Sequence, residues 1–316
     1  MVNPLSALFG AAVRARNEFY DRGTLQVHRL QGPVVSIGNL STGGAGKTPF
    51  LILLGELLTQ RSIFFDVLSR GYRRESKGIA LVDAAGTARQ FGDEPLLIAR
   101  KLGVPVIVGE DRLAAGQYAE QNFGPQLHLL DDGFQHRRLA RDFDIVMLTP
   151  TDVRDSLLPG GRLREPLSAL SRAHAVVLSG NLPSESIPAF VKLRWRVQRS
   201  IFAPNITEAC VAFAGIARPD PFFSQLQQGG LNIVATQKFR DHHPYTGKDV
   251  QTLVRLRDRH RATAFVTTEK DAVNLGEQLR DLGTVHVVPL RMELENADAA
   301  MHELLTRIAE RKPHPA

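Results

Sequence analysis

An eight-residue loop between a predicted strand and a predicted helix has the residue types of a phosphate-binding site. It follows an apolar, β-branched stretch at residues 34–37, precedes an apolar run at residues 49–58, and reads Ser41-Thr42-Gly43-Gly44-Ala45-Gly46-Lys47-Thr48. In a strand, loop and helix of this kind, backbone N–H groups and the helix N-terminus face the anion. Lys47 would reach the β- and γ-phosphates, and Thr48 would offer its hydroxyl to Mg²⁺.

The loop departs from the strict phosphate-binding pattern at one position. The pattern G-x-x-x-x-G-K-[ST] requires glycine where this chain has Ser41. Gly43 and Gly44 can restore the tight backbone. A plain glycine-rich connection is the alternative, but it does not explain a Lys-Thr pair at the start of the helix. We therefore predict a nucleotide site at residues 41–48.

Two adjacent carboxylates follow another predicted strand. Asp131 and Asp132 come directly after the mostly apolar residues 127–130 and before Gly133. Mg²⁺ prefers oxygen ligands and keeps part of its hydration shell, and phosphate-loop enzymes hold it with an acidic side chain. An Asp-Asp-Gly turn alone is common. After a phosphate loop it favours a metal site, in which either carboxylate could contact the ion.

Asp93 lies in Gly92-Asp93-Glu94-Pro95, directly before a helical run at residues 96–102. A carboxylate here could act in catalysis. Local sequence favours a simpler interpretation, in which Asp93 is the N-cap and Pro95 occupies the first turn.

Two basic segments complete the set of candidates. Arg70, Tyr72 and Arg73 follow a predicted strand at residues 63–68, which would place basic groups at the carboxyl edge of a sheet, where α/β folds bind ligands. A solvated basic loop is an equally good alternative. Residues 158–166 are rich in proline, glycine and arginine, and we interpret them as a site loop at the sheet edge.

Strands that alternate with helices along the chain must position these residues. This alternation predicts an α/β fold with a mostly parallel sheet covered by helices on both faces. It continues towards the C-terminus with predicted strands at residues 209–214, 231–235, 264–268 and 285–290. Residues 194–205 are predicted to be an extended connection. We therefore expect a core domain at residues 25–200 and a smaller α/β domain at 201–316 that closes over the cleft.

Composition limits the classes of protein and partner. The chain has 316 residues, a net charge of +6 and one cysteine, Cys210, which excludes an internal disulfide and a cysteine-based metal cluster. The charge favours an anionic partner, which could be nucleic acid, acidic lipid or a phosphorylated metabolite. No apolar run is long enough to predict a transmembrane helix. Charged residues interrupt the N-terminus, so no signal peptide is expected.

Residues 1–24 are predicted to be an amphipathic N-terminal helix. Leu5, Leu8, Phe9, Ala12 and Val13 recur at helical spacing. Such a helix could lie in a membrane interface. Packing on the core of the protein itself is at least as good an interpretation of the periodicity.

Taken together, these segments of the sequence resemble the tetraacyldisaccharide 4′-kinase family, also called the lipid A 4′-kinase family. The matching blocks span nearly the whole chain in order: Pro4-Leu5-Ser6, Ser36-Ile37-Gly38-Asn39-Leu40 through Lys47-Thr48-Pro49, Leu68-Ser69-Arg70-Gly71-Tyr72, Gly92-Asp93-Glu94-Pro95, Asp131-Asp132-Gly133-Phe134-Gln135-His136, Pro159-Gly160-Gly161-Arg162-Leu163-Arg164-Glu165-Pro166, Phe213-Ala214-Gly215, Phe239-Arg240-Asp241-His242-His243 and Thr268-Glu269-Lys270-Asp271. Ser41 agrees with the deviant phosphate loop of this family.

The resemblance implies a P-loop NTPase-like fold and ATP-dependent phosphorylation of the 4′-hydroxyl of a tetraacyldisaccharide 1-phosphate, giving lipid IVA. It implies ATP and Mg²⁺ as cofactors and work at the cytoplasmic face of the inner membrane of a Gram-negative bacterium. By the same resemblance Asp93 is the catalytic base and His242 its partner across the cleft. Arg70, Tyr72, Arg112, Arg164 and Glu165 are expected to bind the substrate or assist the metal.

Two other classes of function stay open. One is a membrane-associated ATPase or GTPase switch of the deviant Walker type. Thr42 occupies the position where such switches usually carry a second lysine, which counts against that class. The other is a basic nucleic-acid-binding module, which the absence of clustered aromatic residues and of a known reader motif makes a poor match. No nucleic acid is therefore expected, and the resemblance implies no stable protein partner.

Overall fold

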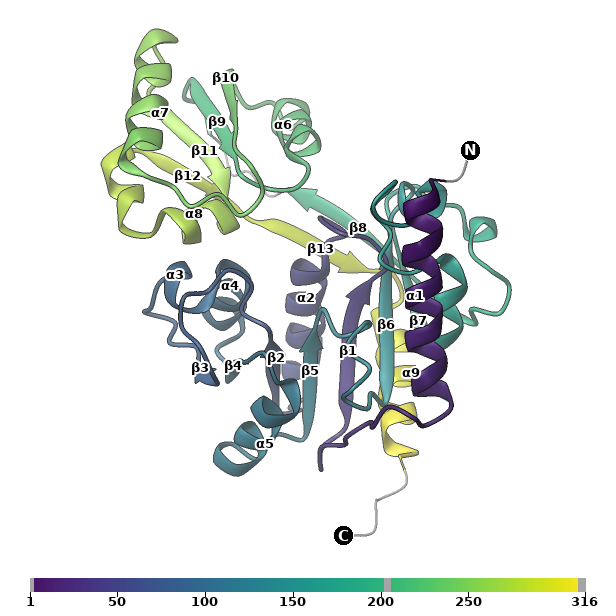
Figure 1. Ribbon diagram of the computed structural model, residues 1–316. Coiled ribbons are helices and arrows are strands. Elements are labelled where there is room, and N and C mark those ends of the chain that lie inside the picture. Colours follow the sequence, from purple (N-terminus) through teal and green to yellow (C-terminus); the bar gives the residue numbers. More distant parts are fainter. Residues whose placement is uncertain (1–2, 202–205, 312–316) are drawn as a thin grey trace.

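The computed structural model describes residues 3–201 and 206–311, which form two α/β units, each built around its own sheet (Figure 1). The large sheet has the strand order β13-β8-β7-β6-β1-β5-β2-β4-β3. Its members are β1 (Val34–Asn39), β2 (Phe65–Ser69), β3 (Ala80–Leu81), β4 (Val106–Val108), β5 (Leu127–Asp131), β6 (Phe143–Leu148), β7 (Ala175–Ser179), β8 (Leu193–Ile201) and β13 (Leu290–Leu294). Neighbouring strands are parallel except at the two edges, where β3 and β13 run antiparallel.

The small unit has the strand order β10-β9-β11-β12, and its strands are all parallel. They are β9 (Cys210–Ala214), β10 (Ile233–Lys238), β11 (Ala264–Thr268) and β12 (Val285–Val288). The described helices are α1 (Pro4–Asp21), α2 (Lys47–Thr59), α3 (Ala88–Phe91), α4 (Asp93–Leu102), α5 (Arg112–Asn122), α6 (Pro219–Gln228), α7 (Gly247–Arg259), α8 (Glu269–Leu275) and α9 (Ala297–Ala309). Short 3-10 turns lie at Asp152–Arg154, Leu167–Arg172, Ser184–Ser186 and Gly276–Leu282.

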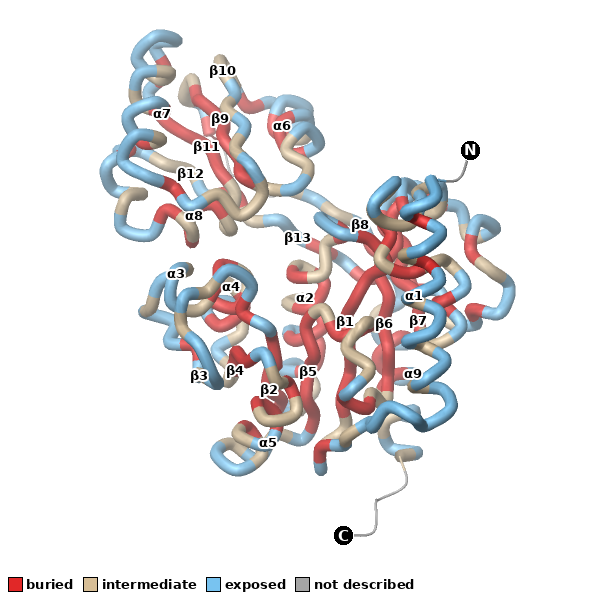
Figure 2. The backbone as a smooth tube through the Cα atoms, in the orientation of Figure 1, coloured by how far each residue is buried: buried red, intermediate tan, exposed pale blue. Residues whose placement is uncertain are grey.

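The central strands are apolar along their whole length because both faces of the large sheet are covered. Every residue of β1, β2, β5, β6 and β7 is buried, as the red strands in Figure 2 show. In β6, Ile145 joins the core that contains α2, α4 and α9, whereas Val146 joins the opposite core with residues 163–191. This confirms the predicted mostly parallel α/β fold with helices on both faces.

Helix α2 lies deep in the large unit. Phe50, Leu51 and Leu58 have no exposed side-chain surface, and Leu54 has 1%. A helix buried to this degree is fixed against the sheet, so the loop that precedes it leaves β1 at a defined position. The phosphate loop therefore lies at the carboxyl edge of the sheet.

Helix α1 is present as predicted, but Leu5, Leu8 and Phe19 face outwards. Leu5 is 61% exposed and Leu8 is 69% exposed, whereas the residues it buries are Ser6 and Gly10. Ser6 Oγ donates to the carbonyl of Leu157 at 2.9 Å. Small residues at the contact let the helix approach closely, and of its large apolar side chains Phe9 and Val13 are half-buried.

The predicted domain boundaries need correction at the C-terminal side. Residue 200, the predicted end of the core domain, lies next to the end of β8 at Ile201, but the second domain does not continue to residue 316. After β12 the chain returns as β13, which pairs with β8, and then as α9, whose Met301 and Leu304 lie in the core of the large unit. The small unit thus comprises only the residues from about 206 to 288, between β8 and β13.

Two local predictions fail for the same reason. Residues 194–201, predicted to be an extended connection, belong to strand β8; residues 202–205 of that prediction lie outside the described part of the chain. Residues 285–290, predicted to be one strand, divide into β12 and the start of β13, which belong to different sheets. Both stretches are extended, and sequence pattern alone does not say which sheet an extended segment joins.

The corrected boundary leads to a stability prediction. Leu304→Ala in α9 should lower the free energy of unfolding by about 2 to 5 kcal/mol, because it leaves a cavity in the large core. Amide hydrogen exchange should then accelerate in β1 and β6. The control is Leu253→Ala in α7, which is equally buried but lies in the small unit. Faster exchange in β9–β12 after Leu304→Ala, with β6 unchanged, would contradict the assignment of α9.

Candidate active site

A cavity of about 1270 Å³ lies between the two units. Its walls come from the loop before α2, the ends of β2 and β5, the start of α4, the paired strands β8 and β13, and the loop before α7. The predicted residues among those that line it are Ser41, Thr42, Gly43, Gly44, Ala45, Gly46, Lys47, Thr48, Arg70, Tyr72, Asp93, Arg112, Asp131, Asp132, Arg164 and His242. The fold thus gathers at one place residues that are up to about two hundred positions apart.

The phosphate loop presents a free helix N-terminus to this cavity. Gly46 is the N-cap of α2, has a φ of 89° and offers no side chain to the first N–H groups of the helix. Only glycine adopts this backbone without strain, and uncapped N–H groups at a helix start bind anions. Lys47 Nζ donates to Asn39 Oδ1 at 3.1 Å and lies 3.4 Å from Asp132 Oδ1. Its ammonium therefore lies over the loop, on the side of the cavity.

Segments from elsewhere in the chain hold this loop in place. Thr42 N donates to the carbonyl of Arg162 at 2.8 Å, and Ser41 forms an isolated β-bridge with Leu163. On the other side, Arg199 of β8 donates to the carbonyl of Ala45. Ser41 thus takes part in backbone pairing, which explains why a non-glycine residue is tolerated at this position.

The two carboxylates at the end of β5 have different environments. Asp132 accepts from Arg164 at 2.9 and 2.8 Å, and these contacts with the Lys47 charge hold the pKa of Asp132 well below its usual range despite its burial. Asp131 accepts from Ser69 Oγ at 2.9 Å, while its Oδ1 is buried and has no hydrogen-bond partner among the described residues. Burial, with the charges of Glu94 and Asp132, raises the pKa of Asp131 to about 7.

Asp93 and His242 meet across the cavity. His242 Nδ1 lies 2.8 Å from Asp93 Oδ2 and 3.0 Å from Oδ1, and Asn274 Nδ2 donates to Asp93 Oδ2 at 3.0 Å. Burial disfavours the charged carboxylate, but the hydrogen bond from His242 and the nearby Lys270 charge outweigh it and lower the pKa of Asp93 to about 2. The prediction that Asp93 is the N-cap of α4 is wrong, because Gly92 is the N-cap and Asp93 is the first helical residue. Its side chain is directed to the small unit.

The backbone around His242 is held by the loop after β2. His242 has a φ of 53°, which is unusual for a residue with a side chain. Arg73 donates to the carbonyl of His242 at 2.8 Å, and His242 N donates to the carbonyl of Gly215 at 3.2 Å. The ring of Tyr72 contacts the His242 ring edge-on, with centroids 5.2 Å apart. Tyr72 and Arg73, which follow β2 and were predicted to bind a ligand, thus also hold His242 in place beside Asp93.

Arg112 and Arg164 line the cavity as predicted, whereas Glu165 does not. Arg112 is only 7% exposed, donates to the carbonyl of Glu110 and has an unpartnered Nε among the described residues. Glu165 is buried and accepts from Asn17 Nδ2 at 2.8 Å and from Arg172 Nη2 at 2.8 Å. The chain bends at Arg164 and Glu165, so their side chains leave in different directions. Glu165 therefore ties α1 to the large unit, and its predicted role in the cleft is corrected.

Four residues of this site were not among the predicted ones. Asn39, Arg199, Lys270 and Asn274 contact Lys47, the phosphate loop, His242 and Asp93 respectively. Lys270 follows the end of β11 at the start of a helix, which is the same placement that identified Lys47. Arg199 gave no such signal, because its segment was interpreted as a connection.

Comparison with known proteins identifies the family. The family model described as tetraacyldisaccharide-1-P 4′-kinase matches residues 1–309. The chain is 53% identical to a tetraacyldisaccharide 4′-kinase of Koribacter versatilis, over 98% of this chain and 99% of that protein. The chain belongs to the tetraacyldisaccharide-1-P 4′-kinase family.

A more distant relative and a solved structure support the same family. A tetraacyldisaccharide 4′-kinase of Aquifex aeolicus is 34% identical over 96% of this chain and 97% of the relative. A crystal structure of LpxK from Aquifex aeolicus in complex with ATP matches with a TM-score of 0.77 and 32% identity, covering 96% of this chain and 97% of that one. The member described here is therefore an ATP-dependent kinase of lipid A biosynthesis, and the alternative of a nucleotide-hydrolysing switch is not favoured.

Because the pKa of Asp93 is lowered in the folded protein, its contribution to the free energy of unfolding depends on pH. A carboxylate with a lowered pKa stabilises the folded state above its unfolded pKa, near 3.8, and loses this effect as the pH falls through about 2. The free energy of unfolding of the parent chain should exceed that of Asp93→Asn by on the order of 2 kcal/mol at pH 7. Urea unfolding between pH 7 and pH 3 should show this difference shrinking below pH 4. A difference that grows as the pH falls would contradict the contacts that His242 and Lys270 make with the Asp93 carboxylate.

Proposed function

We propose that the chain transfers the γ-phosphoryl group of ATP to the 4′-hydroxyl of a tetraacyldisaccharide 1-phosphate, with Asp93 as the base. One observation carries this proposal: a single cavity contains both the free N-terminus of α2 with Lys47 and the buried pair of Asp93 and His242. The first part suits a triphosphate, and the second suits a hydroxyl that must lose a proton. A switch that only hydrolyses nucleotide does not require such a pair from a second unit.

The chemistry assigns a role to each side of the cavity. In phosphoryl transfer the transition state is loose, so the protein contributes mainly by positioning and by stabilising charge on the γ-phosphoryl oxygens. Lys47 and the N–H groups of the phosphate loop supply that stabilisation. Asp93 accepts the proton of the acceptor hydroxyl, and His242 orients its carboxylate. A low pKa suits a base that acts late, when the departing proton is already acidic.

Magnesium fits the residues beside the phosphate loop. Asp131 has a buried oxygen without a hydrogen-bond partner among the described residues and a raised pKa, which a bound cation would relieve; Thr48 is mostly buried at the start of α2. The described residues contain no cluster of three or more His, Cys, Asp or Glu side chains that could hold a metal. Phosphate oxygens and water would therefore complete the coordination, as is usual for Mg²⁺. When bound, the ion neutralises charge on the β- and γ-phosphates.

The basic residues that line the cavity suit an acidic acceptor. Burial, together with repulsion from Arg70, lowers the pKa of Arg112. Two neighbouring cations, one of them with a free buried N–H, favour binding of an anion or of sugar oxygens. Tyr72 also lines the cavity, is 54% exposed and offers an aromatic face. We assign Arg70, Tyr72 and Arg112 to the acceptor.

Transfer of labelled phosphate from ATP to a tetraacyldisaccharide 1-phosphate tests this function. The parent chain should phosphorylate the disaccharide, and Asp93→Asn should reduce kcat by about a hundredfold or more. The affinity for ATP should change little, because Asp93 lies across the cavity from the phosphate loop. ATP hydrolysis that proceeds at full rate without the disaccharide would instead indicate a switch. If Asp93→Asn lost ATP affinity and turnover to the same extent, Asp93 would not be the base.

We further propose that α1 lies on the cytoplasmic surface of the inner membrane. Its exposed residues include Leu5, Leu8 and Phe19, which is 49% exposed, and no described part of the protein covers them. Arg14 and Arg16 lie on the same helix and can meet lipid phosphates. No helix in the described part of the chain is long and apolar enough to cross a membrane. A contact of α1 with the membrane surface would bring the cavity near a lipid-anchored acceptor.

Sedimentation with vesicles that contain anionic phospholipid tests the role of α1. The double variant Leu5→Ser with Leu8→Ser should bind vesicles about a hundredfold more weakly, at about 1.5 kcal/mol for each leucine. Affinity for ATP should not change. Phe64→Ser removes a similarly exposed apolar side chain before β2 and is the control. If the double variant and the control changed sedimentation equally, α1 would have only a structural role.

A further inference from the structure

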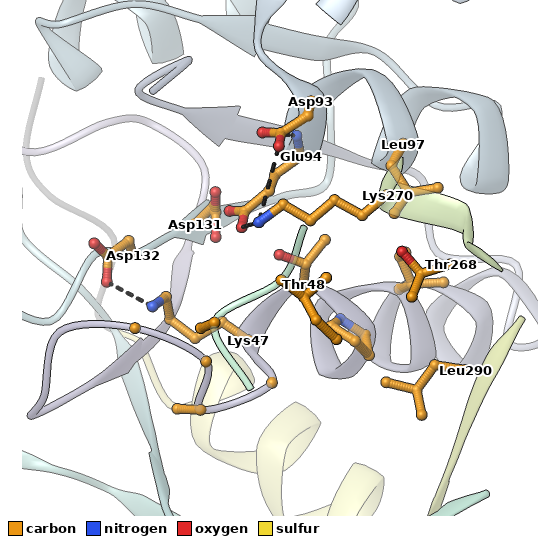
Figure 3. Close-up of a pocket in the computed structure, with 18 of the residues that line it drawn as sticks. Lys47, Thr48, Asp93, Glu94, Leu97, Asp131, Asp132, Thr268, Lys270 and Leu290 are labelled. Atoms are coloured by element: carbon orange, nitrogen blue, oxygen red, sulfur yellow. Dashed lines mark hydrogen bonds and ion pairs between the residues drawn. The ribbon is translucent and has the colours of Figure 1, made fainter. Parts of the chain in front are cut away.

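The ammonium of Lys270 lies at the centre of the contact between the two units. Its Nζ is 3.1 Å from Glu94 Oε1, 3.4 Å from Asp241 Oδ1, 3.2 Å from His242 Nε2 and 3.8 Å from Asp93 Oδ2. Figure 3 shows the side chain extending from the small unit to Glu94, beside Asp93 and Asp131. Although its burial opposes the charge, the carboxylates of Glu94, Asp93 and Asp241 outweigh this effect and raise the pKa of Lys270. Lys270 is therefore a fixed positive charge.

The contact between Lys270 and His242 determines where the imidazole carries its proton. An ammonium has three donors and no acceptor. His242 Nε2 must therefore accept from Lys270 Nζ, at 3.2 Å, through its lone pair. The proton of the neutral ring then lies on Nδ1, which faces Asp93 Oδ2 at 2.8 Å and donates to it.

The other groups around His242 would favour a charged ring if Lys270 were absent. From α4, Asp93 and Glu94 face it, the latter with Oε1 3.9 Å from Nε2; from its own loop, Asp241 lies 3.8 Å from Nε2. Tyr72 contacts the ring edge-on, and Arg73 binds the backbone carbonyl of His242. Three carboxylates beside one imidazole stabilise the imidazolium.

We propose that Lys270 is a positioning residue that keeps His242 neutral, with its proton on Nδ1, so that the imidazole donates a hydrogen bond to Asp93 without pairing with it as a cation. The proposal rests on the role of Asp93 as base given above. An imidazolium at 2.8 Å would attract the carboxylate charge more strongly and make Asp93 a weaker proton acceptor. Because the charge of Lys270, 3.8 Å away, already lowers the pKa of Asp93, a neutral ring spares Asp93 a second and closer cation.

Asn274 acts in the same direction from the same helix. It lies four residues after Lys270 on α8, so both side chains are on one face, and its amide donates to Asp93 Oδ2 at 3.0 Å. An amide, like a neutral imidazole, donates a hydrogen bond without adding a net charge. Helix α8 thus presents one orienting donor to Asp93 and one cation to its partner His242.

Nitrogen NMR of the imidazole in the free protein tests the proton position directly. The His242 signal is assigned by its loss in His242→Gln. At pH 7 the parent chain should show a protonated Nδ1 and an unprotonated Nε2. Lys270→Met should show both nitrogens protonated, whereas Lys270→Arg should keep the neutral ring. A parent chain with the proton on Nε2, or Lys270→Met with an unchanged neutral ring, would overturn the proposal.

The pH dependence of kcat/KM provides the second readout. In Lys270→Met the acidic limb should move up by about one pH unit or more, since His242 must now lose a proton before Asp93 can act. Activity should fall about tenfold at pH 7 and recover towards pH 9, while Lys270→Arg keeps the parent profile. A loss that is equal at every pH would reduce Lys270 to a structural contact.

Lys101→Met is the matched control. Lys101 pairs with Glu269, which is next to Lys270 in sequence. The substitution Lys101→Met therefore removes a lysine from the same contact between α4 and α8 but leaves the surroundings of His242 unchanged. Its pH profile should keep the parent shape, and a shift equal to that of Lys270→Met would contradict the proposal. Because the NMR measurement needs no substrate, its outcome stands even if Asp93→Asn retains turnover and the role of Asp93 fails.

Discussion

The pairing of buried charge is the constraint on which the arrangement of the active site depends. The cavity contains the carboxylates of Asp93, Glu94, Asp131 and Asp132, and such groups are costly to bury unless cations or hydrogen-bond donors hold them. Arg164 and Lys47 hold Asp132, whereas Lys270 and His242 of the small unit hold both Asp93 and Glu94. Of these four, Asp131 has a buried carboxylate oxygen for which the described part of the chain offers no hydrogen-bond partner, which is why we propose the metal site there.

The same constraint joins the two units. Asp93 and Glu94 belong to the large unit, while Lys270 and His242 belong to the small one, so separating the units would expose or unpair these charges together. The chain crosses between the units through β8 and β13, which also pair with one another. A crossing made of two paired strands restricts how the units can move relative to each other. Arg199 on β8 additionally contacts the phosphate loop.

The sequence predicted most of the fold and the polar residues that lie at strand ends. The phosphate loop, Asp131, Asp132 and the residues after β2 were found because strand ends, glycines and helix starts leave a local pattern. The resemblance to the kinase family, not the local pattern, pointed to Asp93 and His242 as a pair, and the local interpretation of Asp93 as a cap was wrong. Glu165 was misplaced because nothing in its sequence shows to which side its side chain turns. Arg199 and the return of the chain through β13 depend on pairing between distant segments.

The bend at residues 164 and 165 links two surfaces that are otherwise separate. Arg164 reaches Asp132 and Asn39 beside the phosphate loop, while the next residue, Glu165, holds Asn17 of α1. If α1 rests on the bilayer as proposed, the height of the reacting centre above the lipid plane is set by this short rigid connection. The enzyme then selects its acceptor by a vertical distance as well as by chemistry. A sugar hydroxyl that lies deeper in the headgroup layer, or farther above it, would miss the γ-phosphate even if its functional groups were identical.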